Sequence, residues 1–234
     1  MEEIKIAPEV LFYFGPVKIT NSLFTCFIVS FLIIIFSLLL RKKIALIPSG
    51  FYNFIESAFE NVFSFITSNL GKEGEKYFPL IVTIFFYVLL NNWFGILPFI
   101  NGVSLSDKHL FRSTFSDINM TLGLALGSMI AVHFLALKEL KLNHLKKFFN
   151  FSNPINFFIG ILELISEFSK IFSFSFRLFG NIFAGEVLLV IIGFLVPLVA
   201  SVPFMGLEIF VGFIQALIFA SLIMIFLKIS LEHH

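Results

Sequence analysis

Charged residues and cysteine are both scarce in this sequence of 234 residues. Asp, Glu, Lys and Arg make up 13% of it, about half of what a soluble domain of this size uses to cover its surface. The single cysteine, Cys26, excludes an intrachain disulfide and a metal site built from cysteines. The net charge of +1 supplies no basic field for nucleic acid, so no nucleic-acid partner is expected. These absences point away from a soluble domain.

Apolar residues, in contrast, make up 58% of the chain, and the mean hydropathy is +0.99. A bilayer core about 30 Å thick is crossed by about 20 apolar residues in a helix. Apolar runs of that length predict an all-α, polytopic membrane protein in contact with membrane lipid, with 1–234 forming a single membrane domain. The five predicted membrane-embedded helices are 19–40, 78–99, 119–137, 154–196 and 204–229.

The segment 48–70 differs from these spans because polar and apolar residues alternate at helical spacing. Glu56 and Glu60 lie four residues apart, while Phe and Ile recur on the other side of the same helix. This pattern predicts one amphipathic helix that lies on the membrane surface rather than crossing it.

Basic residues predict the orientation of the spans. The triplet 41–43 (Arg-Lys-Lys) follows the first span, and Lys138 and Lys141 end the third. Positive residues favour the cytoplasmic side, so the N-terminus is expected outside and, after five spans, the C-terminus in the cytoplasm. The start of the chain lacks the basic flank of a cleaved signal peptide, so the first span is expected to stay as an anchor.

The segment 154–196 is too long for an upright span. As one helix it would measure about 64 Å, twice the thickness of the bilayer core. Either it breaks near Gly180 or Gly185, or it is a single steeply tilted helix. Pro197 and Pro203 are expected to bracket the turn into the last helix.

A polar stripe runs along this long segment. Charged residues inside a span cost about 2.5 to 3.5 kcal/mol each to insert, and they usually mark ion or substrate paths. A polar stripe on an apolar helix must face protein, water or both. The residues that recur at helical spacing on one face are Glu163, Ser166, Lys170, Ser173, Arg177 and Asn181.

Arg177 is the central residue of this stripe. Its guanidinium stays charged at physiological pH, so it needs an anionic partner, which could be Glu186, Glu208 or a carboxylate of another chain. Glu186 lies nine residues later, about half a turn round the helix, and is expected to point away from Arg177. An antiparallel hairpin could bring Glu208 to Glu186 and Gln215 to Arg177, and two neighbouring buried carboxylates suit proton relay.

Structural interpretations remain open beside these. Arg177 could belong to an intramembrane ion pair, and the serines of the stripe could serve packing. Asp117 and Asn119, at the start of the third span, could cap a helix or line an ion path. His109, His133 and His144 are scattered without ligand spacing, so no metal site is expected. No nucleotide loop or nucleophile–base pair is present, so neither a cofactor nor enzymatic catalysis by this chain is expected.

The residues 177–186, RLFGNIFAGE, closely resemble the signature of the ATP synthase subunit a family. Gln215 is similar to that family's glutamine on the last helix, and Glu163 to its acidic residue before the arginine. The run 91–98 (NNWFGILP) and Asp117–Asn119 also resemble the family, and the similarity covers roughly 75–230.

This resemblance implies a non-catalytic, proton-translocating stator beside a rotating ring of c subunits. Arg177 would face each ring carboxylate as it passes and would separate two aqueous half-channels. Glu186, Glu208, Asn181 and Gln215 would line or shape a half-channel, and the last two helices would form a tilted hairpin along the ring. The implied partners are the c ring, a b-type peripheral stalk and the remaining ATP synthase subunits.

Several family members pair a carboxylate with a histidine at the positions of Glu186 and Glu208, whereas here both are carboxylates. The division of proton relay between the two stays open, as does the choice between protons and sodium ions. A bacterial plasma (inner) membrane is the expected location, with an organelle as the alternative. The rival functions are a self-contained secondary transporter, which would need a midplane substrate site between paired repeats, and a structural membrane subunit.

Overall fold

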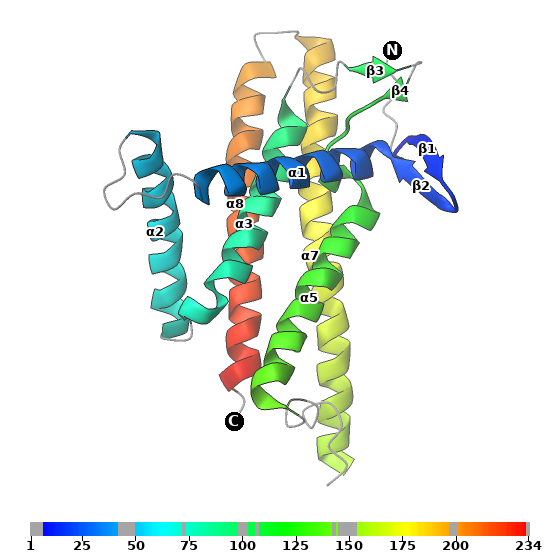
Figure 1. Ribbon diagram of the computed structural model, residues 1–234. Helices are drawn as coiled ribbons and strands as arrows, with labels where there is room; N and C mark the ends of the chain where they lie inside the picture. The colour runs from blue at the N-terminus through cyan, green and yellow to red at the C-terminus, as the bar shows by residue number, and fades with distance from the viewer. Residues whose placement is uncertain are drawn as a thin grey trace.

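Six long helices dominate the part of the chain that the structure describes (Figure 1). This computed structural model describes residues 7–41, 50–71, 74–97, 103–105, 108–141, 144, 154–196 and 201–232. The helices are α1 (Asn21–Arg41), α2 (Phe51–Leu70), α3 (Gly74–Ile96), α5 (Ile118–Leu140), α7 (Pro154–Leu195) and α8 (Ser201–Glu232). The all-α architecture expected from the sequence is confirmed.

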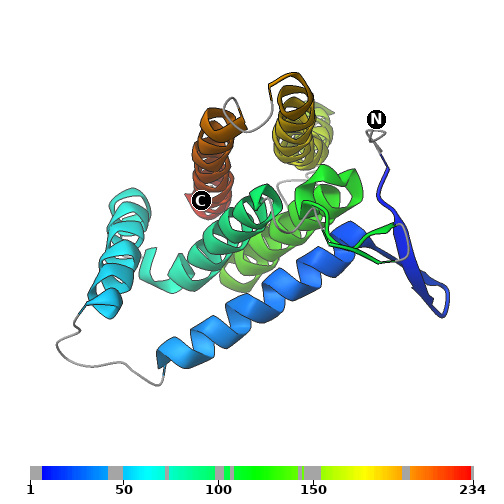
Figure 2. The ribbon, with the colours of Figure 1, turned by 90° about the horizontal axis from the view of Figure 1, so that it is seen from above.

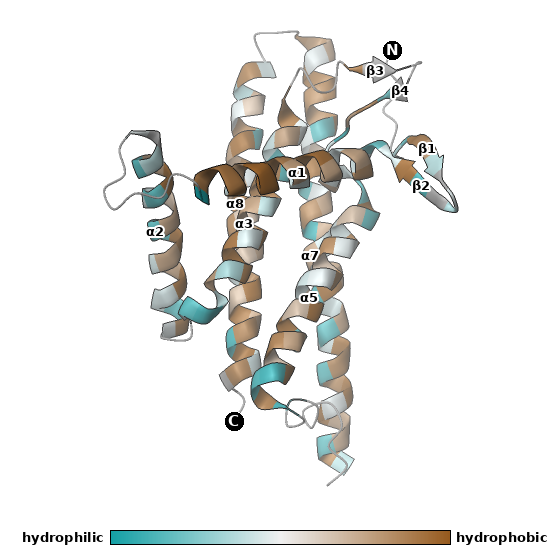
Figure 3. Cartoon of the chain, viewed as in Figure 1, coloured by the Kyte–Doolittle hydropathy of each residue, from teal (hydrophilic) through white to brown (hydrophobic). Residues whose placement is uncertain are grey.

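Five of these helices, all except α2, are long and apolar enough to cross a membrane. Figure 3 shows the difference, because α1 is apolar along nearly its whole length whereas α2 mixes polar and apolar residues. Each helix begins and ends within a few residues of the range expected from hydropathy. The triplet that follows the first span lies outside the described residues except for Arg41.

The long apolar segment forms one continuous helix. α7 has 42 residues without a break, so neither Gly180 nor Gly185 interrupts it. At 1.5 Å per residue it is about 63 Å long. The last helix begins at Ser201, earlier than the expected 204, because Pro203 is accommodated in its first turn, where a missing N–H does no harm. Pro197, expected in the turn, lies outside the described residues.

Two small β-hairpins, which the sequence did not predict, precede α1 and α5. In the first, β1 (Val10–Phe14) pairs antiparallel with β2 (Val17–Thr20), and Gly15 turns the chain with a φ of +60°. In the second, β3 (Ser104–Leu105) pairs with β4 (Lys108–His109). A 3-10 turn, η2 (Thr114–Ser116), then leads into α5. Strands this short leave no run of alternating residues from which to predict them.

The helices form layers that cross one another. α7 and α8 lie side by side as an antiparallel hairpin, and α3 and α5 pack against this hairpin (Figures 1 and 2). α1 lies on the far side of α3 and α5 and runs across α7 and α8 rather than along them (Figures 1 and 2). These helices therefore cannot all stand upright in one membrane.

The core lies where α3, α5, α7 and α8 meet. Small and β-branched residues such as Ala125, Val132 and Ala216 are fully buried there and let the helices approach closely. Two hydrogen bonds of 3.0 Å join α3 to α8. The Asn92 side chain donates to the carbonyl of Gly212, and the Trp93 side chain donates to the carbonyl of Ile209. This packing fixes the register of α8 and with it the position of Glu208.

Candidate ion-translocation site

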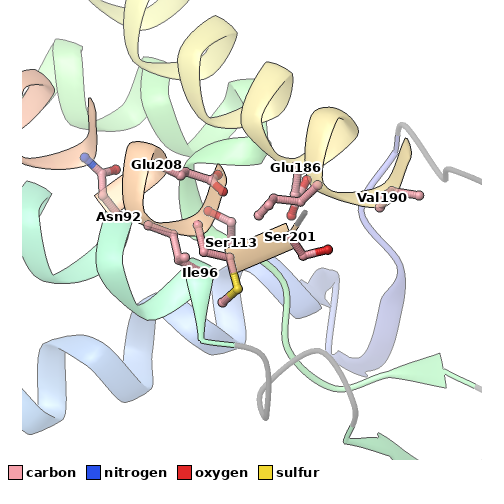
Figure 4. A pocket seen from close by; sticks show the side chains of 10 residues that line it. Asn92, Ile96, Ser113, Glu186, Val190, Ser201 and Glu208 are labelled. Atoms are coloured by element: carbon pink, nitrogen blue, oxygen red, sulfur yellow. The ribbon is translucent and has the colours of Figure 1, made fainter. Parts of the chain in front are cut away.

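A cavity of about 250 Å³ lies where α7, α8 and the end of α3 meet the segment before α5. Glu186 of α7 and Glu208 of α8 both line it, and Figure 4 shows their side chains reaching into the same space from neighbouring helices. The rest of the lining is mostly small or apolar: Asn92, Gly95, Ile96, Ser113, Leu189, Val190, Ser201 and Met205. The antiparallel hairpin thus brings the two predicted carboxylates to one site.

The surroundings of the two carboxylates differ. Glu186 has a cationic neighbour, because Nη2 of Arg112 lies 3.7 Å from its Oε2. Glu208 is buried, and its Oε2 accepts no hydrogen bond from any residue that the structure describes. Sequence reasoning did not single out Arg112. The available signal was an arginine just before Asp117, at the mouth of a span in a chain poor in charge.

Asp117 and Asn119 contact each other at the start of α5. Asp117 is buried and caps the helix, because its Oδ1 accepts hydrogen bonds from the Asn119 backbone at 2.9 Å and side chain at 3.1 Å. Its Oδ2 accepts a hydrogen bond of 3.0 Å from Ser22 of α1. These contacts support the capping interpretation, while a role in lining an ion path stays a prediction.

A second polar cluster lies toward the other end of α7. Oε1 of Glu167 accepts a hydrogen bond of 2.8 Å from Lys170, and its Oε2 lies 3.5 Å from Nε2 of His133 on α5. Nδ1 of His133 lies 3.2 Å from Nε2 of His144. The fold therefore gathers two histidines that are far from Glu167 in sequence. Among the residues that the structure describes, no group of three or more potential ligands could hold a metal ion.

Arg177 lies between these two polar regions. It follows Glu167 by ten residues and precedes Glu186 by nine, which places it about 15 Å and 13.5 Å from them along the axis of α7. Its side chain lies on the outer face of α7, the exposed face that carries Phe172, Ser173, Phe176, Arg177 and Gly180. No described residue forms an ion pair or hydrogen bond with it. Neither Glu186 nor Glu208 is its partner, as Glu186 faces the cavity instead.

Large apolar side chains surround Arg177 on this outer face. Phe172 and Phe176 are 51% and 55% exposed, and Ser173 and Gly180 on the same helix are exposed as well. Asn181 and Gln215 are half-buried, as is Glu163, but no contact between Gln215 and Arg177 supports the pairing suggested by the hairpin. Charged residues inside membrane spans usually mark functional positions, so Arg177 stays a candidate residue of the ion path.

Comparison with known proteins shows the family of this chain. A family model described as the ATP synthase A chain matches residues 23–228. The chain belongs to this family. It is 32% identical to the chloroplastic ATP synthase subunit a of Oedogonium cardiacum, over the whole of this chain and 92% of the relative. It is 31% identical to ATP synthase subunit a of Gloeobacter violaceus, over 99% of this chain and 92% of the relative.

Membership of the ATP synthase A chain family confirms the resemblance drawn from residues 177–186. Together with the five apolar helices, it identifies a multi-pass membrane subunit of the synthase that does not itself carry out catalysis.

Proposed function

We propose that this chain translocates protons as the stator of a rotary ATP synthase, with Arg177 between two half-channels. The observation that carries this proposal is the place of Arg177 on α7. Among the described residues it has no ion-pair or hydrogen-bond partner, and it lies on the outer face about midway between the cavity of Glu186 and Glu208 and the cluster around Glu167. Each polar region would form an aqueous half-channel to one side of the membrane, and the charge of Arg177 would keep ions from passing directly from one half-channel to the other.

The partner of Arg177 in this proposal is the carboxylate of a passing c subunit. A guanidinium in an apolar environment favours an ionised carboxylate opposite it, so each ring carboxylate would release its ion as it reaches Arg177. The fixed charge would also stop ions from leaking between the half-channels. Each ion that crosses 100 mV gains about 2.3 kcal/mol, so such a leak would waste a large part of the driving force. Asn181, Gln215, Ser173 and Glu163 would shape this interface.

The crossing of the helices supports a tilted hairpin. α1 has 21 residues and measures about 32 Å, which matches the bilayer core when the helix stands upright. α7 runs across α1 and is twice as long, so with α1 upright the α7–α8 hairpin is steeply inclined. An inclined hairpin would present its exposed apolar face to the side of a ring over a long contact. The amphipathic α2 would lie on the cytoplasmic surface, where a b-type peripheral stalk could bind.

We further propose that the chain resides in a bacterial plasma (inner) membrane with its N-terminus outside and its C-terminus in the cytoplasm. The basic residues Arg41, Lys138 and Lys141 support this orientation. It places the cavity of Glu186 and Glu208 toward the outside, because the segment 103–117 precedes the inward-running α5.

The proposal is tested by ATP-driven acidification of inverted membrane vesicles that contain the complete synthase. Arg177→Ala should abolish pumping while the complex still assembles, whereas the matched variant Arg41→Ala, at the exposed end of α1, should pump normally. Addition of sodium to the wild type then tests whether protons or sodium ions are carried. Undiminished pumping by an assembled Arg177→Ala complex would leave a structural role for this residue.

A further inference from the structure

The guanidinium of Arg112 is held in place beside one of the two cavity carboxylates. Its Nη2 lies 3.7 Å from Oε2 of Glu186, and its Nε donates a hydrogen bond of 2.9 Å to Ser116. Its backbone N–H donates a hydrogen bond of 3.2 Å to Thr25 of α1. The side chain is only 11% exposed, so the cation is fixed from two elements and shielded from solvent.

The other carboxylate has no such neighbour. No described residue forms an ion pair with Glu208, and its Oε2 is buried without a hydrogen bond. A buried carboxylate without an opposite charge is unfavourable when ionised, whereas one beside a fixed guanidinium is stabilised as the anion. The two carboxylates of the cavity are therefore unequal, although they are chemically identical and share the same space.

We propose that Arg112 is a positioning residue that keeps Glu186 ionised. Of the two carboxylates in the cavity, Glu208 is then the one that binds the transported proton and passes it on. This inference rests on the proposed function. The proton binds to a carboxylate oxygen of Glu208 and later leaves that same carboxylate. Glu186 keeps its negative charge throughout, balanced by Arg112, and gains or loses no proton.

The charge balance of the cavity follows from three groups. Among the described residues, α7 contributes Glu186, α8 contributes Glu208, and the segment before α5 contributes Arg112. The residues of α3 that face the cavity, Asn92, Gly95 and Ile96, carry no charge. With Glu186 and Arg112 cancelling, the site alternates between neutral and −1 as Glu208 gains and loses its proton.

ATP synthesis by the complete complex in liposomes can separate proton uptake from catalysis. The pH outside the liposomes, where ATP is made, and a potassium diffusion potential are held constant. The pH inside the liposomes, the side that the cavity faces, is varied. The readout is the inner pH at which the rate is half-maximal. The variants are Arg112→Gln, Glu186→Gln, and the two combined.

The two single variants should shift this half-maximal pH in opposite directions. Arg112→Gln removes the balancing cation, so the carboxylates hold a proton more tightly and the half-maximal pH rises by about one unit. Glu186→Gln removes an anion beside Glu208, so the half-maximal pH falls by about one unit. The double variant removes both charges and should return close to the wild-type value, which a merely structural role of Arg112 would not produce.

Two further variants, Ser116→Ala and Arg112→Lys, test the inference in case Arg112→Gln does not fold. The first loosens the guanidinium and should raise the half-maximal pH by a smaller amount, and the second keeps the charge and should shift it less than Arg112→Gln. An unshifted profile in assembled Arg112→Gln and Ser116→Ala complexes, or shifts of the same sign for Arg112→Gln and Glu186→Gln, would overturn the inference. Arg177→Ala measured in parallel separates the two failures, because full activity in that variant would overturn the proposed function itself.

Discussion

Gly185 lies directly against the side chain of Glu208. A Cβ placed on residue 185 would lie 2.9 Å from Cδ of Glu208 and closer still to its Oε1, so an added side chain at this point would have to displace the Glu208 carboxylate. The glycine lets the hairpin close around Glu208 and holds its carboxylate in the cavity beside Glu186.

Gly185→Ala should therefore displace Glu208 and lower the rate of ATP-driven proton pumping by about tenfold or more, since small displacements of a reacting group have large effects on rate. The matched control is Gly193→Ala on the same helix, where a Cβ would lie 3.9 Å from Ser201 Oγ, an ordinary contact. Both changes raise helix propensity equally. Equal pumping by the two variants would show that the contact with Glu208 is unimportant.

Thr114→Val should destabilise the chain by about 1–3 kcal/mol, because it leaves the buried Oδ1 of Asn91 without its donor. The Thr114 hydroxyl donates a hydrogen bond of 2.8 Å to that oxygen, and both residues are fully buried. The measurement is the temperature at which the chain dissociates from the detergent-solubilised synthase. Thr83→Val, at an exposed position of α3, is the control and should leave that temperature nearly unaltered. Similar effects of the two substitutions would contradict a special role for the buried pair.

Asp117→Ala should lower the same dissociation temperature, since loss of a helix cap costs about 1–2 kcal/mol. Asp117→Asn keeps an oxygen for the backbone N–H of Asn119 and can still pair with Ser22, so this variant should remain stable and pump protons. A stable Asp117→Asn complex that fails to pump would instead show that the carboxylate charge belongs to the ion path.

Much of the fold was predictable because the bilayer imposes a local rule. About 20 apolar residues make a span wherever they occur, so α1, α3 and α5 could be placed from hydropathy alone. The sequence did not decide whether the segment 154–196 is a broken helix or one tilted helix, since both have the same composition. The structure gives a continuous helix. The hairpins of β1 with β2 and of β3 with β4 were too short to leave a pattern.

The sequence predicted which helices carry the residues of the candidate site, but not which residues from other segments contact them. Helical spacing separated Arg177 from Glu186, and the hairpin geometry suggested that Glu208 meets Glu186. The same reasoning did not find Arg112 beside Glu186, or His133 beside Glu167. Those pairs join residues far apart in sequence, and no periodicity within one helix can indicate them.

The sequence by itself determined that this chain is a membrane protein of the ATP synthase A chain family, with a permanent positive charge in the middle of its longest helix. Hydropathy is a local property, and an arginine stays charged wherever the fold puts it. Only the tertiary structure decided which of two identical carboxylates stands beside a cation. That choice depends on how α3, α7, α8 and the segment before α5 pack against one another, and a shift of one residue in α7 or α8 would place a different side chain in the cavity.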